Sequence, residues 1–208
     1  MSGPFAGRTL CIATMHGKER VLAPRLEAGL DVRCVLPPAG FDSDRFGTFT
    51  GERPRRGTAH DAARAKAEAA MQAAGADLAV ASEGSFGPHP DAFLATVGAE
   101  LVLLVDRTLG LEIAGQHVTT ETNFARRECR TCDDVAAFAE RVGFPSHALV
   151  LTAGDPPLAV RRGLADADAL QRAVDEVRAE AARHGVPWFA GSDMRADRNP
   201  TRMRAIDR

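Results

Sequence analysis

The sequence predicts an α/β fold, a single three-layer-like domain spanning residues 1–208 with a central mixed sheet. Short apolar runs of strand length alternate with segments of helical periodicity along the chain. With 208 residues, 45% of them hydrophobic, the chain is long enough to bury one sizeable core and short for two. A turn followed by a returning strand indicates an antiparallel pair, so the sheet should be mixed.

Strands are expected where β-branched and other apolar residues cluster between turn residues. The first runs are TLCIAT (9–14), VRCVL (32–36), DLAVAS (77–82) and ELVLLVD (100–106). The turn RTLG (107–110) then leads into the returning strand LEIAGQHVTT, and HALVLT (147–152) and LAVRR (158–162) follow.

Helices are expected between these strands. The segments 166–184 and 133–143 each carry apolar residues along one face, and 58–75 is rich in alanine, which favours close packing. A first helix from Lys18 to Gly29 contains Pro24, which should kink or shorten it because proline lacks a backbone N–H.

Two segments lack regular periodicity. Residues 36–57 form a long connection dense in glycine and proline, which we expect to move and to form one wall of a ligand cleft. The basic C-terminal segment 192–208 should be mobile. It either closes over an anionic ligand through Arg195, Asn199 and Arg202 or is a charged, poorly ordered terminus.

Composition limits the classes of partner. The 26 basic and 28 acidic residues nearly balance, which disfavours nucleic acid and favours a small-molecule phosphate ligand. No apolar run reaches the length of a membrane span and the N-terminus lacks a signal peptide, so we expect a cytoplasmic protein without a membrane partner. A homodimer is left open. Cys129 and Cys132 have no second ligand pair at zinc spacing, so we expect no metal there.

The first candidate site follows the first strand, where Thr14, His16, Gly17 and Lys18 precede a helix. An anion would fit there, because a helix N-terminus offers unpaired N–H groups and partial positive charge. The turn is not a P-loop, since Ile12 and Glu19 occupy positions that need glycine and Ser or Thr. The alternative is that Thr14 caps the helix and Lys18 is solvated.

The second candidate site is the start of the alanine-rich helix. Asp61 lies near Arg64 and Lys66, and a carboxylate with two cations suits a triphosphate with Mg²⁺. The alternative is that Asp61 forms a capping box with Thr58.

The third candidate site is the end of a buried strand that delivers Ser82, Glu83 and Ser85 to a turn. Glu83 is either a metal ligand or general base, or a solvated turn glutamate, and His89 is interpreted as a loop histidine. A secondary cleft is expected from Glu121, Asn123, Ser146 and His147.

The order of these three motifs resembles the inosine/xanthosine triphosphate pyrophosphatases and the related Maf-like proteins over roughly residues 9–86. The resemblance implies an inosine triphosphate pyrophosphatase-like fold. It implies that Lys18 binds phosphate, that Asp61 stands at a catalytic, metal-binding position, and that Lys66 and Glu83 match a family lysine and acidic residue. A second likeness covers most of the chain. MHGKE, FGTFTGE, ASEGSFGPHP and DMRADRNPTRM resemble an uncharacterised bacterial family, a domain of unknown function.

The function expected from the sequence is a Mg²⁺-dependent hydrolase of a nucleotide or related phosphate compound. Asp61 and Glu83 would hold the metal and orient water, while Lys18 and Lys66 would offset phosphate charge. The alternative is a non-catalytic nucleotide- or anion-binding module on the same scaffold. A structural partner protein is the third class, which a large exposed apolar patch would favour.

Overall fold

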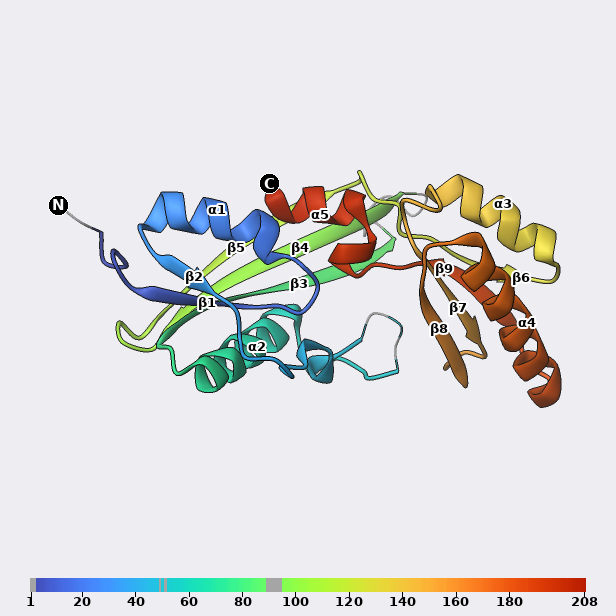
Figure 1. Cartoon of the computed structure of the whole chain (residues 1–208), viewed down its shortest axis with the longest axis horizontal. Coiled ribbons are helices and arrows are strands. Elements are labelled where there is room, and N and C mark those ends of the chain that lie inside the picture. The colour runs from blue at the N-terminus through green and yellow to red at the C-terminus, as the bar shows by residue number, and fades with distance from the viewer. Residues whose placement is uncertain (1–2, 49, 51, 89–94) are drawn as a thin grey trace. The chain divides into compact units, whose positions relative to one another are not determined.

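The structure is a computed structural model that describes residues 3–48, 50, 52–88 and 95–208 (Figure 1). Contacts divide the chain into two compact units. Unit 1 comprises Met1–Thr48, Arg53–Thr120 and Met203–Arg208, and unit 2 comprises Phe49–Glu52 and Glu121–Arg202. The single domain stays a prediction, because it depends on whether the two units unfold together. None of the helices in the described part of the chain is long and apolar enough to cross a membrane.

The sheet of unit 1 is mixed, as predicted. Its strand order is β2 (Arg33–Val35), β1 (Thr9–Ala13), β3 (Leu78–Pro88), β4 (Thr96–Asp106) and β5 (Leu111–Thr119). The first three strands run parallel, and β4 and β5 are each antiparallel to the preceding strand. Both β3 and β4 have 11 residues and extend beyond the predicted runs.

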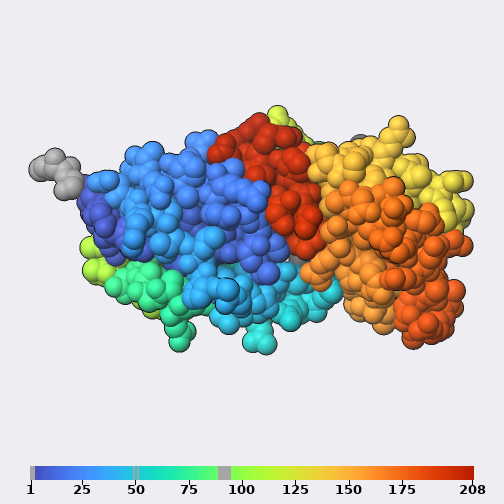
Figure 2. All heavy atoms as spheres, in the orientation of Figure 1, coloured from blue at the N-terminus to red at the C-terminus, as the bar shows by residue number. Residues whose placement is uncertain are grey.

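Helices cover the two faces of this sheet (Figure 1). The alanine-rich α2 (Ala59–Ala74) packs Ala63, Ala67 and Met71 against small residues of β1 and β3, and the short side chains allow the close approach predicted for it. The opposite face carries α1 (Glu19–Leu30) and the last residues of α5 (Pro200–Asp207), whose side chains adjoin in Figure 2. Arg25 Nε donates to Asp207 Oδ1 at 2.7 Å and joins these two helices.

Pro24 lies inside α1 and does not shorten it, while the kink stays a prediction. The residue is exposed, but it lacks the backbone N–H, and its ring crowds the carbonyl of Arg20 one turn earlier. We expect Pro24→Ala to stabilise the protein by about 1–2 kcal/mol, because the carbonyl of Arg20 regains a donor. The denaturation midpoint measured by circular dichroism would show this. Arg20→Ala, an exposed change in the same helix, is the control and should shift the midpoint little.

Unit 2 is built on a four-stranded sheet in which every neighbouring pair is antiparallel. Its strand order is β6 (Arg126–Cys129), β9 (Trp188–Ser192), β7 (Leu149–Ala153) and β8 (Ala159–Leu164). The helices α3 (Cys132–Val142) and α4 (Ala167–His184) complete a β-α-β-β-α-β order, typical of split β-α-β folds. Both helices share one core with the sheet, centred on Phe138, Leu151 and Val177.

Candidate anion site at the end of strand β1

The connections around β1 create a topological switch point. The chain leaves β1 through α1 to reach β2 on one side, and it returns through α2 to reach β3 on the other. In open α/β sheets, ligands bind beyond the carboxyl ends of strands at such a point. The β1–β3 register ends at the pair Ala13 and Ala81, so the turn after β1 and Ser82 of β3 lie at this crevice.

Lys18 lies at the crevice and is buried. Its exposed fraction is only 7%, and its Nζ donates to Ser82 Oγ at 2.8 Å and to the Ser82 carbonyl at 3.3 Å. The alternative of a solvated lysine is therefore wrong. Thr14 is not the helix cap either, because its Oγ1 accepts from the N–H of His16 at 3.1 Å and α1 begins after Lys18 without a side-chain cap. Gly17 takes a positive φ of 70° in this turn.

Glu83 lies on the opposite face of β3 from Ser82, because successive strand residues point to opposite faces. It is 8% exposed, so a solvated turn glutamate is excluded. Lys66 of α2 forms an ion pair with Glu83 Oε1, and Arg55 Nη2 lies 3.3 Å from Oε2. Arg55 also donates to Ser85 Oγ at 3.0 Å and to the Gly84 carbonyl at 2.7 Å. The structure therefore brings Lys66, Glu83 and Ser85 together.

Asp61 forms the capping box that the sequence offered as its alternative. Asp61 Oδ2 accepts from the backbone N–H of Thr58 at 2.9 Å and from its hydroxyl at 2.7 Å, and these bonds lower the pKa of Asp61. Arg64 turns away to Glu112, with 2.7 Å between Nη2 and Oε2. Within the described residues, no contact joins Asp61 to Glu83.

The donor set does not fit Mg²⁺. The ion needs oxygen ligands, usually carboxylates with free lone pairs. Glu83 contacts two cations through its two oxygens, and Asp61 is held by Thr58. The described part of the chain holds no group of three or more His, Cys, Asp or Glu side chains that could bind a metal.

Three residues near the crevice were not among the sequence candidates. Arg55 comes from the predicted loop wall, where the basic run RPRRG was the available signal. Asp44 lies in a 3₁₀ turn of the same loop, and its Oδ1 is 3.0 Å from His16 Nε2. Glu100, only 3% exposed, is opposite Gly84 in register and so on the face of Ser82. Phe49, Gly51 and His89 lie outside the described residues.

The secondary cleft candidates lie in unit 2, where most of them bond to one another. Asn199, fully buried, donates to Asn123 Oδ1 at 2.8 Å, and its Oδ1 accepts from the N–H of Arg202 at 3.0 Å. His147 lies between Ser146 Oγ at 3.0 Å and Thr201 Oγ1 at 2.9 Å. These bonds anchor the segment after β9.

The other two candidates of this group have different surroundings. Arg195 forms an ion pair with buried Asp193, with 2.6 Å between Nη2 and Oδ2. Glu121 is exposed. Mobility of the segment 192–208 stays a prediction.

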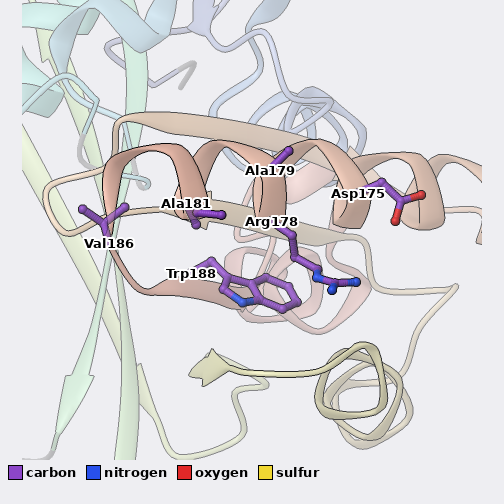
Figure 3. A pocket seen from close by; sticks show the side chains of 7 residues that line it. Asp175, Arg178, Ala179, Ala181, Val186 and Trp188 are labelled. Carbon is purple, nitrogen blue, oxygen red and sulfur yellow. The ribbon is translucent and has the colours of Figure 1, made fainter.

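A separate groove of about 590 Å³ lies beneath α4 in unit 2 (Figure 3). Trp188 and Arg178 line it, and none of the predicted site residues does. Arg178 Nη1 also lies 3.2 Å from Cys132 Sγ, which is exposed. Cys129 is buried, and burial raises the pKa of its thiol. The two cysteines of the C-x-x-C motif thus have unlike environments.

The fold and site together define an α/β protein with buried charged side chains beside a strand switch point. The chain belongs to the family described as a domain of unknown function (DUF6671), which matches residues 66–208. The match begins at Lys66 and includes β3 and the segment Glu121–Arg202 of unit 2, with Lys18 before it. No curated protein matches the chain. Membership of a family of unknown function is confirmed, while a bacterial source and the likeness to the pyrophosphatases stay predictions.

Proposed function

We propose that unit 1 binds the phosphate group of a small molecule, such as a nucleotide, at the crevice beyond β1. The observation that carries the proposal is that cations contact the segment Ser82–Ser85 on both faces of β3. Lys18 bonds to Ser82 on one face, and Lys66 and Arg55 contact Glu83 on the other. The Lys18 face adjoins the switch point after β1 and the start of α1, and this placement favours an anionic ligand beside Lys18.

The formal charges around the end of β1 balance. Lys18, Arg55 and Lys66 are opposed by the carboxylates of Asp44, Glu83 and Glu100, so an anion would be held by directed donors more than by net charge. Arg55 presents a planar fork of donors that matches phosphate oxygens, and Lys18 adds a compact charge at the start of α1. Ser82 supplies a hydroxyl beside Lys18.

A binding module is favoured over a metal-dependent hydrolase. Hydrolysis of the kind implied by the pyrophosphatase resemblance needs carboxylates that hold a metal or activate water. Glu83 is neutralised by Lys66 and Arg55, and Asp61 stabilises the start of α2. The pyrophosphatase-like fold and activity therefore form the second, weaker proposal, supported by the motif order and by the buried position of Glu83.

The test is a thermal-shift screen of inorganic phosphate, nucleoside mono- and triphosphates and sugar phosphates, each with and without Mg²⁺. A ligand at 100 times its dissociation constant should stabilise the protein by about 2.7 kcal/mol. Lys18→Met should lower affinity at least about tenfold, because it removes a buried charge while keeping the side-chain length.

Arg64→Met is the matched control, since Arg64 is a cation on α2 that bonds to Glu112. It should leave ligand affinity unchanged. Circular dichroism of each variant without ligand separates a lost site from a lost fold. If no phosphate compound stabilises the wild-type protein, the proposal fails. Mg²⁺-dependent release of phosphate or pyrophosphate would establish the hydrolase instead.

A further inference from the structure

Strand β5 is the outer strand of the unit 1 sheet. Among the described residues it pairs only with β4, through nine residues in unbroken register. The five residues from Glu112 to Gln116 are all exposed. Its outer edge therefore presents a row of backbone donors and acceptors.

This edge lacks the devices that usually protect an outer strand. The sequence LEIAGQHVT contains neither proline nor lysine, and its register with β4 has no bulge. Ile113 and Val118 are 51% and 57% exposed. The one carboxylate, Glu112, is already bonded to Arg64 of α2 at 2.7 Å. The edge thus has no bulge, its one carboxylate is already paired, and it is partly apolar.

We propose that two copies of the chain pair through β5 in antiparallel fashion, about a twofold axis that passes through Gly115. The axis must run perpendicular to the joined sheet, so a residue can only oppose one on the same face. Centring on Gly115 pairs the whole of Leu111–Thr119 with its copy. The pairing joins two five-stranded sheets into one.

The paired strands are compatible in charge and in space. Glu112 opposes Val118 and Ile113 opposes His117, so no two like charges face each other. Gly115 opposes its own copy, and a Cβ built on Gly115 meets nothing within 4 Å. A second copy is the partner that this edge fits best, because the self-complementary strand supplies both halves of the ladder.

The experiment is oxidative cross-linking of Gly115→Cys in a Cys132→Ser background, which removes the exposed native thiol. Directly opposed strand residues have Cα atoms about 5 Å apart, within the range of a disulfide. The matched control is Val118→Cys, whose two copies would lie six residues out of register, about 20 Å apart. Gly115→Cys should form a covalent dimer at least about tenfold faster than the control.

Sedimentation of the wild-type chain gives the second readout. We expect a mass that rises with concentration toward twice 22.1 kDa, and Ile113→Lys should return it to the monomer value. A monomer at every concentration overturns the proposal. Equal cross-linking of the two cysteine variants, or a dimer that persists in Ile113→Lys, also overturns it. None of these readouts depends on ligand binding at the β1 crevice.

Discussion

Asp106→Ala should destabilise unit 1 by about 3 kcal/mol, because it removes one partner of a buried ion pair and leaves the other charge unpaired. Asp106 is 2% exposed and accepts two bonds from Arg8, at 2.5 and 2.9 Å. Its Oδ1 also accepts from the N–H groups of Thr108 and Leu109, at 2.9 and 3.1 Å. The variant leaves a half-buried guanidinium and two turn N–H groups without their acceptor. Urea denaturation followed by circular dichroism would measure the loss.

The pH profile and a control variant sharpen this prediction. Hydrogen bonds from Arg8 lower the pKa of Asp106, so its contribution to stability is present above the unfolded pKa near 3.9 and declines as pH falls through the folded pKa. The stability difference between wild type and Asp106→Ala should therefore shrink in acid. Asp207→Ala removes a similar but exposed partner of Arg25 and should change little. A difference between wild type and Asp106→Ala that is constant with pH would contradict the assignment.

The urea denaturation of Asp106→Ala also tests the predicted single domain. Trp188 is the only tryptophan of the chain, and it lies in the core of unit 2. Its fluorescence therefore follows unit 2, whereas circular dichroism follows both units. If Asp106→Ala shifts the Trp188 transition as far as the dichroism transition, the two units unfold as one domain.

Asn199→Ala should destabilise unit 2 by about 3 kcal/mol, because it removes a fully buried amide that serves several partners. Asn199 Nδ2 donates to Asn123 Oδ1 at 2.8 Å and to the Asp193 carbonyl at 3.0 Å. Its Oδ1 accepts from the N–H of Arg202 at 3.0 Å. The Asn123 oxygen, the Asp193 carbonyl and the Arg202 N–H would each lose this hydrogen-bond partner. Water cannot easily replace the partner in this buried region.

Trp188 fluorescence during urea denaturation would report the effect of Asn199→Ala. Gln171→Ala is the control, since Gln171 is an exposed amide of unit 2 whose bonds to Asp175 are long, at 3.4 Å. It should be close to neutral. If both variants unfold at the same urea concentration as wild type, the buried network contributes nothing to stability.

The sequence was sufficient for the elements with strong periodicity. The predicted range 166–184 differs from α4 by a single residue, because an aspartate cap and Gly185 mark its ends. The strands β6 and β9 were missed, since RREC is mostly charged and WFAGS contains glycine. Both are strands because neighbouring strands supply their hydrogen bonds, which is a tertiary effect. The helix α5 was missed for a different reason, because its eight residues PTRMRAID are mostly polar and show little apolar periodicity.

The candidate site was only partly predictable. Lys18 was identified because it follows a strand, and strand ends are positions that local sequence can mark. Glu83 was identified because it follows the predicted run 77–82, but the predicted turn there is wrong, since β3 continues to Pro88. Lys18 and Glu83 lie on opposite faces of β3, because Ser82 and Glu83 alternate along the strand. This alternation can be read from a sequence only once the limits of the strand are known. Arg55 and Glu100 join them from a loop and from another strand, so only the folded chain brings them near. Asp61 showed the limit of motif matching, because a cap and a metal ligand look alike in sequence.

The division of the chain has a consequence for the order in which its parts are completed during translation. Unit 1 begins the sequence, yet it also contains Met203–Arg208, where Ile206 is 5% exposed. A nascent chain that has emerged as far as Thr120 therefore carries all the strands of the first sheet but not this last turn of helix. Folding of unit 1 can start first and finish last, and a fragment cut at Thr120 would expose the surface that Ile206 covers.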